Sequence, residues 1–312
     1  MSLQLRQGAR ARRPVRQTGA GLRRALAGLA VAAGLAQPAG AQTAEEQTER
    51  PRVAAVSWDL AQTLAALDAP PAAVAGLAGY RKWAVTPELP AATVDIGRRM
   101  EPNLSVLRAV DPDLIVMSRF HDQLVDPLSR IAPVQSYQMF PADGDALQRV
   151  RSVAEQVARR LDLMPAYRRL DGELERALDS LSRTVAQAAP GESVYVAYFQ
   201  DEQHVAVYGA GSLFQPILER AGLVNAWQGR TNGWGYAVVE LSELDAGADR
   251  LVVLDPVPDK AQTLMAKSPI WRALPVVRDG RVHRIAPVWA IGGVPSAVRF
   301  ARLLEDALHD GG

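Results

Sequence analysis

The hydrophobic positions between residues 53 and 140 form short runs that alternate with helical patterns. The short runs, rich in Ala, Val and Ile, are typical of buried strands and comprise Val53–Val56, Ala73–Leu77, Thr93–Ile96, Leu114–Met117 and Val134–Tyr137. The segments expected to be helical are Trp58–Leu67, a helix capped by Asn103 that runs to Val110, and Asp122–Ile131. Short strands that alternate with helices predict βα units around a parallel sheet.

A longer helical pattern interrupts this alternation at mid-chain, over residues 143–164. Its apolar residues recur at helical spacing over about five turns, from Leu147 to Leu161. Pro165 marks a break, and a second helical pattern continues to Val185. We expect residues 143–164 to connect two lobes as a stiff helix. The alternative is an ordinary crossover helix within one domain.

The strand–helix alternation resumes after Pro190-Gly191. The predicted strands are Ser193–Phe199, Val205–Tyr208 and Leu251–Leu254, and the first two are expected to form a hairpin across Asp201–Gln203. The predicted helices are Leu213–Ala221, Pro269–Ala273 and Ser296–Leu308. The Asp279-Gly280 pair predicts a hairpin turn within Val276–Val282. The pattern as a whole indicates an α/β fold, with residues 143–164 as the connection between two lobes.

Residues Asn225–Tyr236 fit neither the helical nor the strand period. This stretch contains two of the six tryptophans, an arginine, two asparagines and three glycines before its final tyrosine. The glycines indicate an irregular loop, and exposed aromatic rings on a loop are unfavourable unless something packs on them. The loop either lines a ligand site or caps a core, and residue types alone leave both readings open.

The start of the chain has the features of an export signal. Residues 1–24 hold seven arginines and no acid, Ala25–Ala36 is apolar, and Ala39-Gly40-Ala41 is a small-x-small cleavage motif. We therefore expect a signal peptide over 1–41 and a flexible lead-in over 42–50. Arg23-Arg24 suits a twin-arginine signal, but the full consensus is absent, so the Tat and Sec routes both remain open.

The remaining chain is acidic and lacks the usual catalytic motifs. Without the signal it has 28 basic and 34 acidic residues, which argues against a nucleic-acid partner. No cysteine is present, so disulfides, thiolate zinc sites and a lipid anchor are excluded. No G-x-S-x-G, Walker or H-E-x-x-H motif occurs, and the four histidines lack metal-ligand spacing. We expect a binding protein with no catalytic residue, no metal ligand and no cofactor of its own.

Several segments, most of them in loops, form specific motifs: Gly97–Asn103, Arg130–Pro133, Gly211–Gln215, Asn225–Gly229 with Thr231-Asn232 and Trp234-Gly235 after it, and Pro287–Trp289. With these motifs the chain resembles the FhuD-like family of periplasmic ferric-hydroxamate siderophore-binding proteins, within the long-helix class of ABC-importer substrate-binding proteins. The resemblance covers nearly the whole exported chain. It implies two α/β lobes joined by a single long helix, with a ligand cleft between the lobes: an N-terminal lobe over 51–142, a connecting helix over 143–164 and a C-terminal lobe over 165–312.

The resemblance also implies the residues that contact the ligand. Arg99 matches an arginine that contacts iron-hydroxamate oxygens, and a guanidinium suits clustered oxygens. The other implied contacts are Trp83, His121 (with Phe120 as its neighbouring alternative), Phe199, Asn232, Trp234, Tyr236 and Trp289. Because the ligand already chelates the iron, the resemblance implies no protein metal ligand.

This sequence departs from the family at several positions. His121 and Ile291 stand where the family has tyrosines, and Tyr236 replaces a smaller polar residue. Ser105 and Ser242 occupy the places of two acidic residues that dock the membrane permease. We expect Glu101 and Glu243 to take over this docking.

The expected function is that of a soluble periplasmic monomer that binds a ferric hydroxamate siderophore and delivers it to an inner-membrane ABC permease. The same fold with another bulky chelate, such as haem, a cobalamin or a catecholate siderophore, is the main alternative. A catecholate complex would call for several arginines, and the candidates beyond Arg99 are Arg98, Arg119 and Arg230. A periplasmic enzyme and an adaptor are the remaining alternatives.

Overall fold

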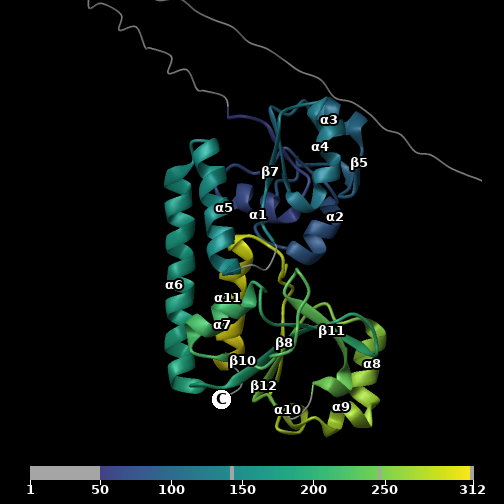
Figure 1. The fold of residues 1–312 in the computed structure, drawn as a ribbon, viewed down its shortest axis with the longest axis vertical. Helices are drawn as coiled ribbons and strands as arrows, with labels where there is room; N and C mark the ends of the chain where they lie inside the picture. Colours follow the sequence, from purple (N-terminus) through teal and green to yellow (C-terminus); the bar gives the residue numbers. More distant parts are fainter. Residues whose placement is uncertain (1–49, 141–143, 245–246, 310–312) are drawn as a thin grey trace, which may run out of the picture. The chain divides into compact units, whose positions relative to one another are not determined.

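The computed structural model describes residues 50–140, 144–244 and 247–309. All of them fall in one compact unit, residues 49–312. The predicted signal peptide (1–41) and nearly all of the predicted lead-in (42–50) lie outside the described residues. The described part contains two large sheets, each covered by helices, and a two-stranded hairpin; a long helical segment lies between the large sheets in sequence (Figure 1).

The N-terminal lobe is built on a five-stranded sheet in the order β3-β2-β1-β6-β7, with every neighbouring pair parallel. Its strands are β1 (Val53–Ala55), β2 (Ala73–Val74), β3 (Val94–Asp95), β6 (Leu114–Ser118) and β7 (Val134–Tyr137). Its helical elements are α1 (Trp58–Ala66), α2 (Leu77–Gly79), the π-helical turn η1 (Tyr80–Ala84), α3 (Leu104–Val110), the 3-10 helix η2 (Arg119–Leu124) and α4 (Val125–Ser129). A small hairpin, β4 (Gly97–Arg98) and β5 (Glu101–Pro102), completes the lobe.

The C-terminal lobe is built on a mixed sheet in the order β11-β9-β8-β12-β13, with β10 paired to β8. Its strands are β8 (Ser193–Phe199), β9 (His204–Tyr208), β10 (Val224–Asn225), β11 (Tyr236–Glu240), β12 (Arg250–Leu254) and β13 (Val282–Ile285). Its helical elements are α7 (Phe214–Ala221), η3 (Leu241–Glu243), α8 (Asp259–Lys267), α9 (Pro269–Ala273), α10 (Pro275–Arg278) and α11 (Val294–His309). The predicted hairpin of β8 and β9 is confirmed.

Two consecutive helices lie between the lobes in sequence, α5 (Ala146–Arg160) and α6 (Met164–Ala188). Asp145 starts α5, because its carboxylate accepts hydrogen bonds from the backbone N–H groups of Leu147 and Gln148. The helix ends at Arg160, where Leu161 leaves helical geometry and Asp162 is left-handed. The break between the two helices therefore lies at residues 161–163, before the predicted break at Pro165. Proline is tolerated in the first turn of α6 because the N–H groups there have no helical partner.

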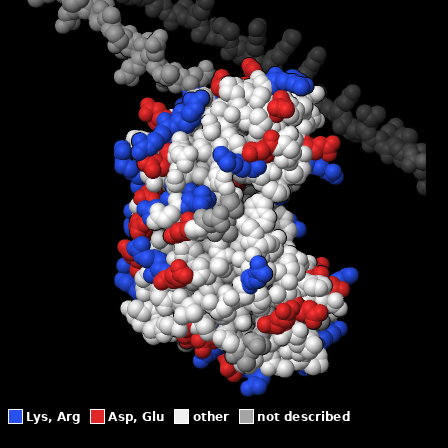
Figure 2. All heavy atoms as spheres, in the orientation of Figure 1, with Lys and Arg blue, Asp and Glu red and all other residues white. Residues whose placement is uncertain are grey.

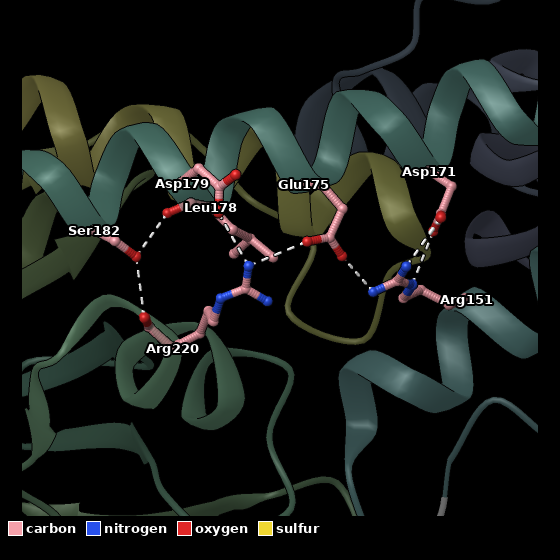
Figure 3. A network of polar contacts seen from close by, with 7 residues as sticks. All are labelled: Arg151, Asp171, Glu175, Leu178, Asp179, Ser182 and Arg220. Carbon is pink, nitrogen blue, oxygen red and sulfur yellow. Dashed lines mark hydrogen bonds and ion pairs between the residues drawn. The ribbon is translucent and has the colours of Figure 1, made fainter.

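The longer of the two helices is α6, with 25 residues against 15 in α5. It reaches the N-terminal lobe through the ion pair of Arg169 with Asp68, which follows α1. At its other end the Ser182 hydroxyl donates to the backbone carbonyl of Arg220 in α7. Glu175 accepts from Arg151 of α5 at 2.5 Å and pairs with Arg220 of α7 at 3.2 Å (Figure 3). The helix thus contacts both lobes.

The predicted hairpin over Val276–Val282 is wrong. Residues Pro275–Arg278 form α10, and β13 pairs with β12 in parallel. Gly280, with a φ of 69°, ends the helix, and the N–H of Arg281 bonds to the carbonyl of Val276 at 2.7 Å. Asp-Gly is here a helix C-terminus of the Schellman type and not a two-residue hairpin turn. Strand β11, at the end of the Asn225–Tyr236 stretch, was not among the predicted strands.

Candidate ligand-binding site

A cavity of about 490 Å³ is lined by residues of both lobes. Ser57, Ser118, Gln200 and Asp255 in its lining lie at the carboxyl ends of parallel strands of the two sheets. This edge is where open α/β sheets place their ligands, and the volume is in the usual range for small-molecule sites. Figure 2 shows the molecule hollowed between the lobes, with mostly uncharged residues around the hollow on the face in view.

Arg99 supplies the positive charge of the cavity lining. It lies at the turn of the β4–β5 hairpin, and its guanidinium carbon is 4.0 Å from the centre of the Trp58 ring and 5.3 Å from that of Trp289. The two indoles are themselves 4.8 Å apart, and Trp58 is fixed by a hydrogen bond from its Nε1 to the carbonyl of Ala75 at 2.9 Å. Cation–π contact on two rings holds the guanidinium in place while its edge stays available for hydrogen bonds.

Asp59 is the acidic neighbour of Arg99 at this end of the cavity. It lies in the first turn of α1, is only 5% exposed, and accepts a hydrogen bond from the N–H of Leu60 at 2.9 Å. Burial raises the pKa of this carboxyl to about 6, and hydrogen bonds and the charge of Arg99 oppose the rise. For Arg99, burial lowers the pKa and Asp59 raises it. The pair brings a carboxylate close to the guanidinium without a direct ion pair.

His121 lines the same end of the cavity and is 2% exposed. Its Nδ1 lies 3.2 Å from the Ser118 hydroxyl, and its Nε2 has no hydrogen-bond partner within the described residues. Burial, together with the charge of Arg99, lowers the pKa of His121 to about 4. The imidazole is therefore neutral at pH 7.

Aromatic pairs form the walls of the cavity and join one lobe to the other. Trp83 of η1 meets Tyr198 of β8 with ring centres 5.7 Å apart. Phe120 of η2 meets Trp234 at 5.0 Å, and Phe140 meets the same indole at 6.0 Å. Because each ring is also part of the lining, a bound ligand would lie against rings from both lobes.

The loop Asn225–Tyr236 divides into a packed base and a cavity wall. In the base, the Asn225 amide donates to the carbonyl of Tyr208 and to Gln215. The Trp227 ring packs on the buried apolar cluster of the C-terminal lobe that includes Phe199 and Trp271. In the wall, Trp234 and Tyr236 line the cavity. Asn232 braces the wall, since its Oδ1 accepts hydrogen bonds from the backbone N–H groups of both residues.

The structure brings most of the predicted ligand-contact residues into one cavity lining. The residues in the lining are Trp83, Arg99, His121, Trp234, Tyr236 and Trp289. Phe199 lies elsewhere, 1% exposed, with its ring 5.9 Å from that of Trp271, because adjacent residues of a strand face opposite ways and Tyr198 is the one that faces the cavity. Asn232 is outside the lining as well and acts on the loop backbone.

Several lining residues were not predicted, chiefly Trp58, Asp59, Tyr198, Tyr208 and Phe140. Trp58 and Asp59 open α1, shortly after β1 ends at Ala55, and the rule that ligands bind at the carboxyl ends of parallel strands is a signal that finds them. Arg98 and Arg119, the reserve cations, are exposed and outside the lining, as is Arg230.

Comparison with known proteins assigns this chain to a family. A model of the periplasmic binding protein family matches residues 53–288. The chain belongs to this family. It is 34% identical over 260 residues to the iron(3+)-hydroxamate-binding protein FhuD of Escherichia coli K12, covering 82% of this chain and 86% of that protein. The family match and this relative confirm the prediction of a binding protein and not an enzyme.

Solved structures agree with this assignment. The siderophore-binding protein FhuD from Vibrio cholerae, determined with Fe3+–Desferal bound, is 29% identical with a TM-score of 0.79, over 84% of this chain and 99% of that one. IsdE of Staphylococcus aureus, determined with heme, shares the fold at 17% identity and a TM-score of 0.61, over 83% of this chain and 99% of that one. The predicted α/β fold with two lobes is confirmed.

Among residues 50–140, 144–244 and 247–309, no three His, Cys, Asp or Glu side chains converge in a way that would hold a metal ion. None of the described helices combines the length and apolar character needed to cross a bilayer.

Proposed function

We propose that this protein binds a ferric hydroxamate complex in the cavity between its lobes. The observation that carries the proposal is the Arg99 guanidinium held between Trp58 and Trp289 in a largely aromatic cavity. A guanidinium can donate to several clustered oxygens, and the rings offer apolar surface to the organic backbone of a chelator. The E. coli relative named above is an iron(3+)-hydroxamate-binding protein. Iron enters here as part of the cargo and needs no ligand from the protein.

The charge of the cavity lining favours a hydroxamate complex over a catecholate complex. Among the described lining residues, Arg99 is the one basic side chain, beside the carboxyls of Asp59 and Asp255. Asp255 is already paired with Arg284 at 2.5 Å. Three hydroxamate monoanions neutralise Fe3+, whereas three catecholate dianions leave a strongly negative complex. A single arginine with a nearby carboxyl suits the neutral cargo.

The test is a titration of the intrinsic tryptophan fluorescence with Fe3+–Desferal, a ferric catecholate complex and haemin. Trp58, Trp83, Trp234 and Trp289 line the cavity, so a bound ferric complex is expected to quench the emission at micromolar concentration. Preference for the catecholate or for haemin would replace the hydroxamate assignment, and the absence of quenching by all three would contradict the proposal.

Delivery to a permease is the second part of the proposed function. Glu101 is exposed on β5 and Glu243 is exposed in η3, one on each lobe, and we propose that they dock the inner-membrane ABC permease. Glu243 also accepts from the N–H of Glu240 at 2.9 Å, which fixes its position. Reversal of both charges to Arg should abolish iron uptake in cells and leave ligand binding intact. Asp306→Arg on α11, another exposed acid, is the matched control.

Export and assembly complete the proposal. Residues 1–41 direct export to the periplasm through the Tat or the Sec route, and the protein acts there as a soluble monomer. Replacing Arg23-Arg24 by two lysines separates the routes, because only the Tat route requires the arginine pair. Loss of the periplasmic product would assign Tat, and unchanged export would assign Sec.

A further inference from the structure

Gln62 of α1 lies at the contact between the two lobes, behind the cavity walls. Its side chain is fully buried, with 0% exposure. The chain segment that follows β13, residues 286–293, belongs to the C-terminal lobe and carries Trp289 in the cavity wall. Its last residue, Gly293, donates a hydrogen bond to Gln62 of α1. A buried amide must satisfy its hydrogen bonds within the protein, so its partners show which segments it holds together.

The side-chain amide of Gln62 makes hydrogen bonds to the two segments that carry the cavity walls. Its Nε2 donates to the carbonyl of Thr86 at 2.6 Å and, more weakly, to the carbonyl of Ala84 at 3.5 Å. Ala84 is the residue that follows Trp83 in the chain. The Gln62 Oε1 accepts from the Ser296 hydroxyl at 3.0 Å and from the N–H of Gly293 at 3.3 Å. The donor side thus holds the segment of Trp83, and the acceptor side holds the segment of Trp289.

The approach of residues 286–293 to α1 is close enough to exclude a side chain. A Cβ at Gly292 would lie 2.6 Å from the Gln62 Oε1 and 2.1 Å from the Ser296 Oγ. At Gly293 it would lie 2.6 Å from the Thr63 Oγ1. Ser296 is itself fully buried at 0% exposure, so the contact has no room to slide.

We propose that Gln62 is a positioning residue that sets the spacing of the Trp83 and Trp289 walls and thereby the affinity for the cargo. The inference rests on the proposed function for its affinity readout. Gln62 is not part of the cavity lining; it acts through the backbone of the two segments that carry the walls.

The variants are chosen to separate positioning from stability. Gln62→Met keeps the length of the side chain and removes all of these hydrogen bonds. Ser296→Ala removes only one bond on the side of the C-terminal lobe. Thr93→Ala is the matched control, because Thr93 is 7% exposed and its hydroxyl donates to the carbonyl of Pro71 within the N-terminal lobe, outside the cavity lining.

Affinity for Fe3+–Desferal is measured on the full exported chain, at a temperature where each variant is folded by far-UV circular dichroism. We expect Gln62→Met to weaken binding about tenfold or more and Ser296→Ala about threefold, from the net value of a buried hydrogen bond. Thr93→Ala should stay within about twofold of the parent. A merely structural role would lower the melting temperature of Gln62→Met and leave its affinity unchanged, which would overturn the inference.

Collisional quenching by acrylamide provides a readout without ligand. Gln62→Met should make the wall tryptophans more accessible to acrylamide than they are in the parent, and Thr93→Ala should not. Parent protein that fails to bind Fe3+–Desferal would contradict the proposed function, and the quenching result would still decide on Gln62. Equal accessibility in Gln62→Met and the parent would refute the positioning role.

Gln62→Glu tests the donor side alone. The introduced carboxyl is buried against the carbonyl of Thr86, so it can donate there as the amide does only while it is protonated. Binding should therefore recover toward that of the parent as the pH falls, with the parent titrated at each pH as the reference. A pH-independent deficit would speak against the hydrogen bond to Thr86 as the cause.

Discussion

Arg99 is the residue on which the proposed ligand contact depends most. Arg99→Ala removes the cation from the lining, and because a hydrogen bond to a charged group is worth about 1.5–3 kcal/mol, we expect the affinity for Fe3+–Desferal to fall about tenfold to a hundredfold. Fluorescence titration measures the change. Arg98→Ala is the matched control, since Arg98 is the exposed neighbour on the same hairpin and should bind like the parent. Equal affinities of the two variants would remove Arg99 from the contact.

Asp59 and His121 make opposite contributions to stability between pH 4 and 6.5. Folding raises the pKa of Asp59 to about 6, so its contribution is complete below about pH 4 and is lost as the pH rises through 6. Folding lowers the pKa of His121 to about 4, so its contribution is complete above about pH 6.5 and is lost as the pH falls toward 4. Each is on the order of 2–3 kcal/mol, and in the parent protein they largely cancel.

Single variants should expose the two contributions. With Asp59→Asn, the free energy of unfolding should rise with pH across this window more steeply than in the parent. With His121→Gln it should fall as the pH rises. Urea denaturation of the parent and both variants from pH 4.5 to 7 measures the slopes. Slopes parallel to that of the parent would show that neither group is buried as described.

At the scale of the helix, α6 contains a glycine in its interior, Gly172, although a long connecting helix needs no glycine there. Gly172→Ala should raise the free energy of unfolding by about 0.5–1 kcal/mol, because alanine loses less backbone freedom on forming a helix. A Cβ there meets only the flexible end of Arg176, at 3.3 Å. Thermal unfolding detects the change. Gly222→Ala after α7 should do the opposite, since Gly222 has a φ of 85°.

The elements that the sequence predicted well are those fixed by local chemistry. Asn103 accepts hydrogen bonds from the N–H groups of Ser105 and Val106, as its position before an apolar helical pattern indicates. The Asp279-Gly280 pair predicts a hairpin turn incorrectly, because the same pair also suits the end of a helix. Only the parallel pairing of β13 with β12 decides between the two. Tertiary pairing is not local information.

The same limit applies to the site. Loop residues such as Arg99 and Trp234 were placed through a resemblance of motifs, and both line the cavity. Phe199 was misplaced by one residue on β8, because the buried strand is apolar on both faces and its pattern does not show which face meets the cavity. Gln62 gave no sequence signal, since its importance depends on segments more than 200 positions away.

At the scale of the whole molecule, the contacts between the lobes predict a small closing motion. The α6 helix bonds to both lobes, and aromatic pairs such as Trp83–Tyr198 and Phe120–Trp234 join them across the cavity. Small-angle scattering should therefore give the same radius of gyration, within error, with and without Fe3+–Desferal. A clear compaction on binding would show a hinge that these contacts do not restrain.

The contact of Gln62 with residues 293 and 296 has a consequence for the order in which the chain can fold. Helix α1 is made early in synthesis, yet part of its buried surface is completed by α11, which is made last, and Leu60 and Leu64 share a core cluster with Val294 and Ala297. Contacts of such sequence separation form late, because closing a long loop is entropically costly. We therefore expect a chain interrupted before α11 to leave part of the α1 surface uncovered and to be degraded by proteases.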